Sequence, residues 1–84
     1  MLSIKSFIDR TGNEVIVNPN EFYFLESGYY YDEDGEEQSC DRYCIGNEDG
    51  DGLSAWLVIT ATYSPYTNTL VHKAVEVDEA WAFV

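Results

Sequence analysis

The clearest pattern of hydrophobic and polar positions lies in residues 53–63. Every second residue there falls on one largely apolar face, while Trp56 and Val58 lie on the other face with two threonines. Alternation with a period of two is typical of a β-strand, and a strand that is apolar on both faces is expected near the middle of a sheet. We therefore predict a central strand over residues 53–63.

The segment after this strand predicts a hairpin, but its return half has two interpretations. Residues 64–68 have the length and composition of a hairpin loop, so the chain should return antiparallel through residues 69–77. A C-terminal helix over residues 70–83 is the alternative, because apolar residues there also follow the 4-3-4-3 spacing of a helix. These residues are Leu70, Ala74, Val77, Trp81 and Val84. Three β-branched valines and the preceding turn favour the strand.

The N-terminal part of the chain predicts another hairpin, followed by a segment with two interpretations. Residues 2–17 contain an alternating run, a turn with the sequence RTGN and a β-branched run. A short helix at residues 19–27 would start with Asn18 as its N-cap and end at Gly28. The aromatic residues of this segment favour a strand instead, so both structures stay open.

These elements together predict one small, mainly β domain spanning residues 1–84. We expect an antiparallel sheet of four to six strands, or an α+β fold if either helix forms. A chain of 84 residues buries only about 60–65% of its unfolded surface, so the core must be small. Aromatic residues make up 15% of the chain, and their large side chains favour a folded domain over a disordered one.

The net charge of the chain is strongly negative and unevenly placed. Sixteen acids against four bases give a net charge of −12. Residues 26–51 hold ten of the acids and one base, so nine of the twelve net charges lie in this segment. Phosphate groups are bound by Lys and Arg, so this composition disfavours direct binding of nucleic acid.

Three consecutive tyrosines, Tyr29, Tyr30 and Tyr31, precede the acidic run. On a strand, alternate tyrosines would pack on the core while the middle one faces the solvent. An exposed tyrosine beside carboxylates would form a contact surface of low rotamer entropy for a partner rich in arginine. The two interpretations are compatible, because one face of the strand can pack on the core while the other face contacts a partner.

Two metal motifs in the sequence are incomplete. Residues 47–52 match the first half of a calcium loop, but Val58 stands where that loop requires a bidentate glutamate. Cys40 and Cys44 are separated by three residues, and His72 is the only histidine that could join them at a zinc ion. We expect free thiols first, a local disulfide second and a metal site last, and we predict no metal and no cofactor.

No motif in the sequence presents the groups of a catalytic site. The chain has no glycine-rich phosphate loop before a helix and no serine nucleophile elbow. A general acid requires a carboxyl group whose pKa is raised by burial or by a close like charge, and a solvated acidic loop provides neither. We therefore expect a protein that is not an enzyme.

The leading hypothesis is an acidic inhibitor protein that binds a basic nuclease or another nucleic-acid-binding protein. Carboxylates on neighbouring strands or on a rigid loop can present charges on the length scale of a phosphate backbone, so the inhibitor would occupy the DNA or RNA site. The expected contact residues are Glu26, Tyr30, Asp32, Glu33, Asp34, Glu36, Glu37, Asp41, Glu48, Asp49 and Asp51.

In size and charge the chain resembles small phage-encoded DNA-mimic inhibitors of the anti-CRISPR, anti-restriction and uracil-DNA glycosylase inhibitor kinds. The resemblance is one of composition over the whole chain, and no motif matches residue by residue, so it transfers no site. It implies an inhibitor that acts through protein contacts. The alternatives are an immunity-type or other interaction module that neutralises a basic toxin, and a small structural β domain with weak calcium binding.

The sequence also bears on where such a protein would work. Its first nine residues lack the apolar run of a signal peptide, and no apolar segment reaches the roughly 18 residues that a membrane-spanning helix requires. Two cysteines are too few for the disulfide framework of a small secreted domain. We expect a cytoplasmic protein without a membrane partner, in the host cytoplasm if it is phage-encoded.

Overall fold

Seven β-strands form a single sheet in the computed structural model, which describes residues 4–46 and 52–83. The strands are β1 Ser6–Ile8, β2 Glu14–Ile16, β3 Tyr23–Tyr31, β4 Glu37–Gly46, β5 Gly52–Ser64, β6 Thr69–Glu76 and β7 Trp81–Ala82. The prediction of a mainly β fold is confirmed. The expected number of four to six strands was too low, because no strand was predicted for β4, which begins inside the acidic run, or for the two-residue strand β7, which is too short for a periodic pattern.

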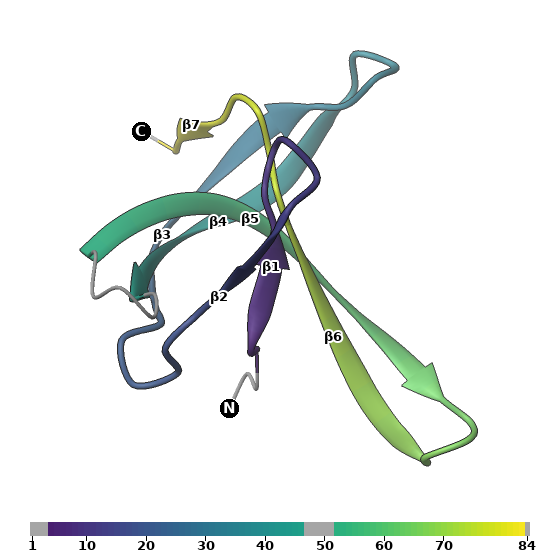
Figure 1. Cartoon of the computed structure of the whole chain (residues 1–84). Helices are drawn as coiled ribbons and strands as arrows, with labels where there is room; N and C mark the ends of the chain where they lie inside the picture. Colours follow the sequence, from purple (N-terminus) through teal and green to yellow (C-terminus); the bar gives the residue numbers. More distant parts are fainter. Residues whose placement is uncertain (1–3, 47–51, 84) are drawn as a thin grey trace.

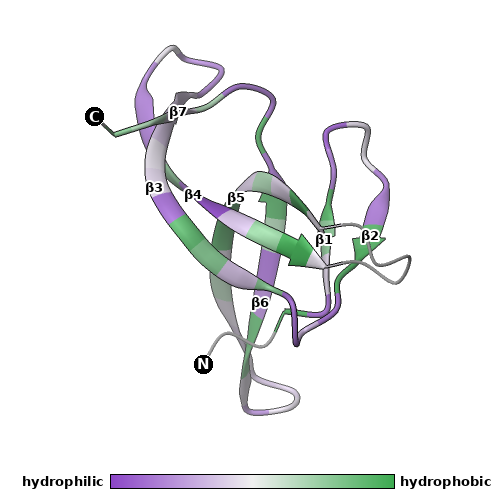
Figure 2. Cartoon of the chain, turned by 90° about the vertical axis from the view of Figure 1, so that its left-hand side faces the viewer, coloured by the Kyte–Doolittle hydropathy of each residue, from purple (hydrophilic) through white to green (hydrophobic). Residues whose placement is uncertain are grey.

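The strand order is β2-β1-β6-β5-β4-β3-β7, which places β5 in the middle of the sheet as its two apolar faces predicted. All neighbouring strands are antiparallel except β1 and β6, which are parallel and pair at Ile8 and Val75. The sequence did not predict this parallel pair, because it joins two distant segments that no hairpin turn connects. Figures 1 and 2 show that the sheet is strongly curled.

Both helical alternatives are wrong. Asn18 makes a turn instead of a helix cap: its side-chain oxygen accepts the backbone N–H of Asn20 at 3.0 Å, and its carbonyl accepts that of Glu21 at 2.9 Å. The C-terminal alternative fails because β6 pairs with β5 along its whole length, which satisfies its backbone as a strand. No helix in the described parts of the chain is long and apolar enough to cross a membrane.

The hydrophobic core lies inside the curl of the sheet. Ala55 and Leu57 of β5 and Ala74 of β6 are buried there against side chains from the N-terminal hairpin and β4. The other buried members of this cluster are Ile4, Phe7, Val17, Tyr43 and Ile45. Within the described residues the sheet has no second layer, so its apolar face is covered by its own curl, by the short strands β1 and β2 and by Phe22.

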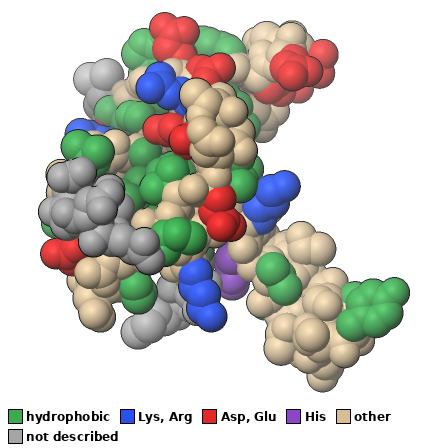
Figure 3. All heavy atoms as spheres, viewed as in Figure 1, with side chains coloured by type: hydrophobic (Ala, Val, Ile, Leu, Met, Phe, Trp, Pro, Cys, Tyr) green, Lys and Arg blue, Asp and Glu red, His purple; other side chains and the backbone are tan. Residues whose placement is uncertain are grey.

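The outer parts of β5 and β6 extend beyond this core as a two-stranded ribbon, residues 60–73, which we call the arm (Figures 1 and 3). Here the alternation continues, but the apolar positions are exposed, including Tyr63 and Leu70, which face each other across the ribbon. The tip is closed by a turn in which Asn68 has a positive φ of 54°. The arm contains no aspartate or glutamate, so it differs in charge from the rest of the molecule.

Two leucines of this hairpin test where the stability of the fold originates. Leu57 is 1% exposed and Leu70 is 62% exposed. We expect Leu57→Ala to lower the free energy of unfolding by about 2–5 kcal/mol, because it leaves a cavity in a small core. Leu70→Ala should change it by less than about 0.5 kcal/mol. Urea unfolding followed by tryptophan fluorescence measures both, and equal losses would show that the arm is part of the core.

Candidate functional site

The turn between β3 and β4 is built by the carboxylate of Asp32. One oxygen accepts the backbone N–H groups of Asp34 at 3.0 Å and Glu36 at 2.9 Å, and the other accepts the side-chain N–H of Gln38 at 3.0 Å. These bonds, the one from Glu36 first, hold the pKa of Asp32 below its ordinary value. Gly35 completes the turn with a positive φ of 79°. The turn is therefore held by its own hydrogen bonds.

The turn between β1 and β2 is also held by an aspartate that accepts hydrogen bonds from the residues after it. The carboxylate of Asp9 accepts the hydroxyl of Thr11 at 2.7 Å and the backbone N–H groups of Thr11 and Asn13, each at 2.9 Å. The Thr11 hydroxyl is the largest cause of the lowered pKa of Asp9. Gly12 has a positive φ of 89°, so the sequence RTGN closes the hairpin as predicted.

The segment after β6 brings two further acids and a tryptophan to the same end of the sheet. The backbone N–H of Val77 donates to the carbonyl of Trp56 at 3.1 Å, which directs the chain past Asp78 and Glu79 into β7. Strand β7 then pairs with β3, where Trp81 lies opposite Tyr29. Gly28 permits this approach, because a Cβ at that position would overlap the carbonyl of Trp81 and the Trp56 ring.

The paired ends of β3 and β7 carry a cluster of aromatic rings. Tyr29 stacks on Trp81 with ring centroids 5.6 Å apart and on Phe83 at 5.8 Å. Tyr31 meets Trp81 edge to face at 5.8 Å. Such pairs contribute about 0.5–1.5 kcal/mol each beyond their buried area, so the cluster fixes β7 on the sheet.

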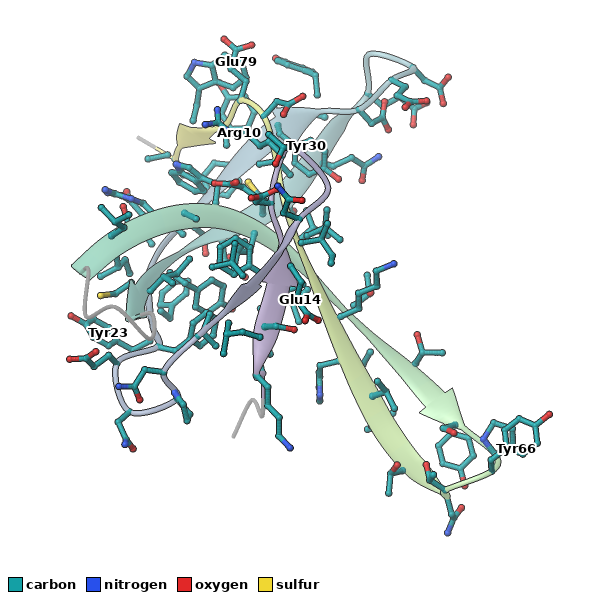
Figure 4. All side chains as sticks on the ribbon, in the orientation of Figure 1. Arg10, Glu14, Tyr23, Tyr30, Tyr66 and Glu79 are labelled. Carbon is teal, nitrogen blue, oxygen red and sulfur yellow. The ribbon has the colours of Figure 1, made fainter. Side chains whose placement is uncertain are left out.

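The three segments together enclose a cleft of about 560 Å³, which we call the acidic cleft. Asp9 and Arg10 line it from the β1/β2 turn, Tyr30 to Glu33 from the end of β3, and residues 75–79 with Trp81 from the end of β6 and the start of β7. Its lining holds six carboxylates and one guanidinium group. Figure 4 shows Arg10, Tyr30 and Glu79 gathered at this end of the sheet.

Some of the predicted contact residues come together at this end of the sheet. Tyr30, Asp32 and Glu33 line the acidic cleft. Asp34, Glu36 and Glu37 are exposed in the adjoining β3/β4 turn and at the start of β4, where Figure 3 shows a group of carboxylates. We call the acidic cleft and these three residues together the acidic end.

Other predicted contact residues are engaged within the sheet or lie outside the described residues. Glu26 accepts a hydrogen bond from the Arg42 guanidinium at 2.8 Å, and Asp41 accepts one from the Ser27 hydroxyl at 2.9 Å. The remaining three, Glu48, Asp49 and Asp51, belong to the undescribed segment 47–51 together with most of the calcium half-motif. The acidic run of the sequence is thus not one continuous surface among the described residues.

Ten residues that line the acidic cleft were not among the predicted contact residues, and five of these ten are the acids and the tryptophan that give the cleft its chemistry. They are Asp9, Glu76, Asp78, Glu79 and Trp81. The acids lie outside the densest acidic run, and Trp81 was considered only as part of a helical spacing. A short acidic stretch directly after a predicted strand was the available signal for Asp78 and Glu79, but only the parallel pairing of β1 with β6 places Asp9 beside them.

The cysteines of β4 and Tyr43 between them lie in the sheet and serve its packing. Cys40 and Cys44 are free thiols on β4, and burial raises the pKa of Cys40. Within residues 4–46 and 52–83, no three His, Cys, Asp or Glu side chains are gathered so that they could hold a metal ion. Tyr43 is buried in the core, stacked on Phe22 with ring centroids 4.9 Å apart, so it contributes no exposed contact surface.

Comparison of the chain with known proteins identifies no relative. No protein-family model matches it, and neither a curated protein nor a solved structure matches it. The function must therefore be argued from the chain's own residues.

Substitution of Gly28 tests whether the close approach of β7 is needed for the site. We expect Gly28→Ala to lower the free energy of unfolding by about 1–3 kcal/mol and to weaken the Tyr29 and Trp81 pairing, because the new methyl group overlaps backbone. Gly52→Ala is the control, since a Cβ there meets no atom of a described residue within 4 Å. Urea unfolding and the near-UV circular dichroism of the aromatic cluster measure the effect. Equal behaviour of the two variants would contradict the account.

The pH dependence of stability tests the role of Asp32. A carboxyl group whose pKa is lower in the folded state stabilises the fold above its unfolded pKa of about 3.9, and this contribution disappears as the pH falls through the folded pKa. We therefore expect Asp32→Asn to melt below the native protein at pH 7, with a difference that vanishes in acid. Asp34→Asn is the control, because its side chain accepts no hydrogen bond from a described residue, and it should melt with the native protein throughout.

Proposed function

We propose that this protein binds a basic, nucleic-acid-handling protein and occupies the site where DNA or RNA would lie. The observation that carries the proposal is the acidic end, where carboxylates from three distant parts of the chain meet with one base among them. An anionic surface of this kind attracts a protein surface rich in Lys and Arg and repels nucleic acid itself.

The basic residues of the chain leave most of this charge uncompensated. Among the described residues there are two ion pairs, Arg10 with Glu76 at 3.7 Å and Arg42 with Glu26 at 2.8 Å. Lys5 and the arm residue Lys73 form no ion pair with the described part of the chain. The negative charge of the acidic end therefore remains available to a partner.

The rigidity of the turns supports nucleic-acid mimicry over a loose acidic tail. Asp9 and Asp32 fix the backbone of their turns through hydrogen bonds, so the chain that carries the neighbouring acids is held in place before binding. A preordered array loses less conformational entropy on binding than a flexible one.

A toxin-neutralising interaction module is the second candidate, because the same charges would attract any basic protein. The two functions differ in one property of the complex. A nucleic-acid mimic and DNA compete for the same site on the partner, whereas a module bound elsewhere on a toxin leaves the DNA site open.

Charge reversal within the β3/β4 turn tests the proposal. We expect the double variant Asp34→Lys with Glu36→Lys to lose capture of basic partners, while Asp32 is kept because it builds the turn. The double variant Glu14→Lys with Glu21→Lys has the same net charge and changes exposed acids outside the acidic end, so it should retain capture.

The measurement is a pull-down from bacterial lysate at low and high salt, with and without duplex DNA, read by mass spectrometry. The proposal predicts nucleases or other nucleic-acid-binding proteins that high salt or added DNA releases. Capture that is unaffected by DNA would favour the toxin-neutralising module. Equal loss in both variants would show that net charge alone is responsible, and this would contradict a specific acidic end.

A further inference from the structure

The acidic cleft differs from the exposed β3/β4 turn in its chemistry, because aromatic rings and carboxylates share its walls. Trp81 is 43% exposed and Tyr31 is 55% exposed, so both rings remain partly accessible although they pack against each other. An aromatic ring attracts a cation placed over its face within about 6 Å of its centre. Rings with carboxylates beside them are therefore suited to an organic cation that is flat and charged.

The carboxylates of the cleft fall into two groups. Asp9 and Asp32 accept several hydrogen bonds within their turns, and Glu76 accepts one from the backbone N–H of Arg10 at 3.2 Å. The other group, Glu33, Asp78 and Glu79, forms no ion pair and accepts no hydrogen bond from a described side chain. These three carboxylates are the ones available to a ligand.

We propose that the acidic cleft receives one arginine side chain of the protein partner. The guanidinium group stacks on the ring of Trp81, beside the edge-to-face ring of Tyr31, and pairs with carboxylates from the free group. Arginine fits this combination better than lysine, because its guanidinium is planar, weakly hydrated and able to pair with a carboxylate through two parallel hydrogen bonds. The inference rests on the proposed function, since it names the residue type that the basic partner inserts.

Arg10 already brings one guanidinium group to the rim of the cleft. Its contact with Glu76 is long, 3.7 Å from Nε to Oε1, and its side chain is 59% exposed. It is the only base among the residues that line the cleft, so its charge repels an arriving cation and competes with it for the carboxylates. Removal of this charge should therefore strengthen binding, whereas removal of an acid should weaken it.

The experiment uses a capped arginine, N-acetyl-arginine-N-methylamide, titrated into the whole protein and followed by the indole N–H signals in NMR spectra. The chain has two tryptophans, and Trp56 does not line the cleft, so its signal is an internal control. We expect the Trp81 signal to shift in a saturable way, the Trp56 signal to stay in place, and the capped lysine to bind more weakly. The capped form of citrulline, which has arginine's shape without its charge, should produce no shift.

Variants then test the residues of the cleft. Asp78 and Glu79 lie outside the strands, so their substitution leaves the sheet pairing unchanged. Glu79→Gln and Asp78→Asn should each weaken arginine binding about 2- to 5-fold, a size typical of exposed charge contacts. Arg10→Gln should tighten binding by a similar factor. Trp81→Phe keeps a ring in place and should weaken binding by less than Trp81→Ala, which removes the ring. Because both variants lack the Trp81 indole signal, their affinity is measured by isothermal titration calorimetry, with the native protein measured in the same way. Thermal melts confirm that each variant is folded.

The proposal is overturned if both tryptophan signals shift alike, if the shift does not saturate, or if Glu79→Gln and Arg10→Gln change the affinity in the same direction. Its failure is distinguishable from failure of the proposed function. Partner capture that DNA abolishes, without arginine binding in the cleft, would support the proposed function and contradict the arginine site. Arginine binding without DNA-sensitive capture would support the arginine site and contradict nucleic-acid mimicry.

Discussion

The structure depends on the burial of one face of β5 by the curl of its own sheet. In the part of the chain that the structure describes, Leu57 and its neighbours have no second layer to pack against. The N-terminal hairpin folds over them instead, and β1 pairs with β6 in parallel. This pairing brings the β1/β2 turn beside the segment that follows β6, and the acidic cleft forms where these two segments meet the end of β3.

The same constraint divides the molecule into two parts of different chemistry. At one end, hydrogen-bonded aspartates hold two turns and leave neighbouring carboxylates exposed without partners. The arm leaves the core in another direction and contains no acid, as Figure 3 shows on the face in view. Mutual repulsion among so many acids opposes folding, and the aromatic cluster of β3 and β7 offsets part of this cost where the acids are close together.

The fold could be predicted from the sequence wherever the hydrophobic pattern had the period of a strand over many residues. Strand β5 has such a pattern and was predicted. For β6, the β-branched valines favoured a strand over a helix, and the strand is confirmed. The parallel pairing of β1 with β6 could not be predicted, because a single residue pair, Ile8 with Val75, produces no periodic pattern in the sequence. The core also ended earlier along β5 than the alternation suggested, since Ala61 and Tyr63 belong to the exposed arm.

The site was predictable only in the part that is contiguous in sequence. Glu33, Asp34 and Glu36 lie close together in the acidic run, so composition alone made them candidates, but composition could not show that Asp32 is occupied in building their turn. Trp81 joins the acids through the pairing of β7 with β3, which requires a glycine at position 28. Such contacts depend on tertiary structure, and the only sign of this one in the sequence is the glycine at position 28.

The central claim is that the acidic end is the surface that touches the partner. Zero-length carbodiimide crosslinking of the captured complex tests it most directly, because this reagent joins a carboxylate to a lysine only when the two are in contact. The account predicts that mass spectrometry finds the crosslinks at Glu33, Asp34, Glu36, Asp78 or Glu79. Crosslinks confined to Glu14 or Glu21, with none at the acidic end, would contradict it.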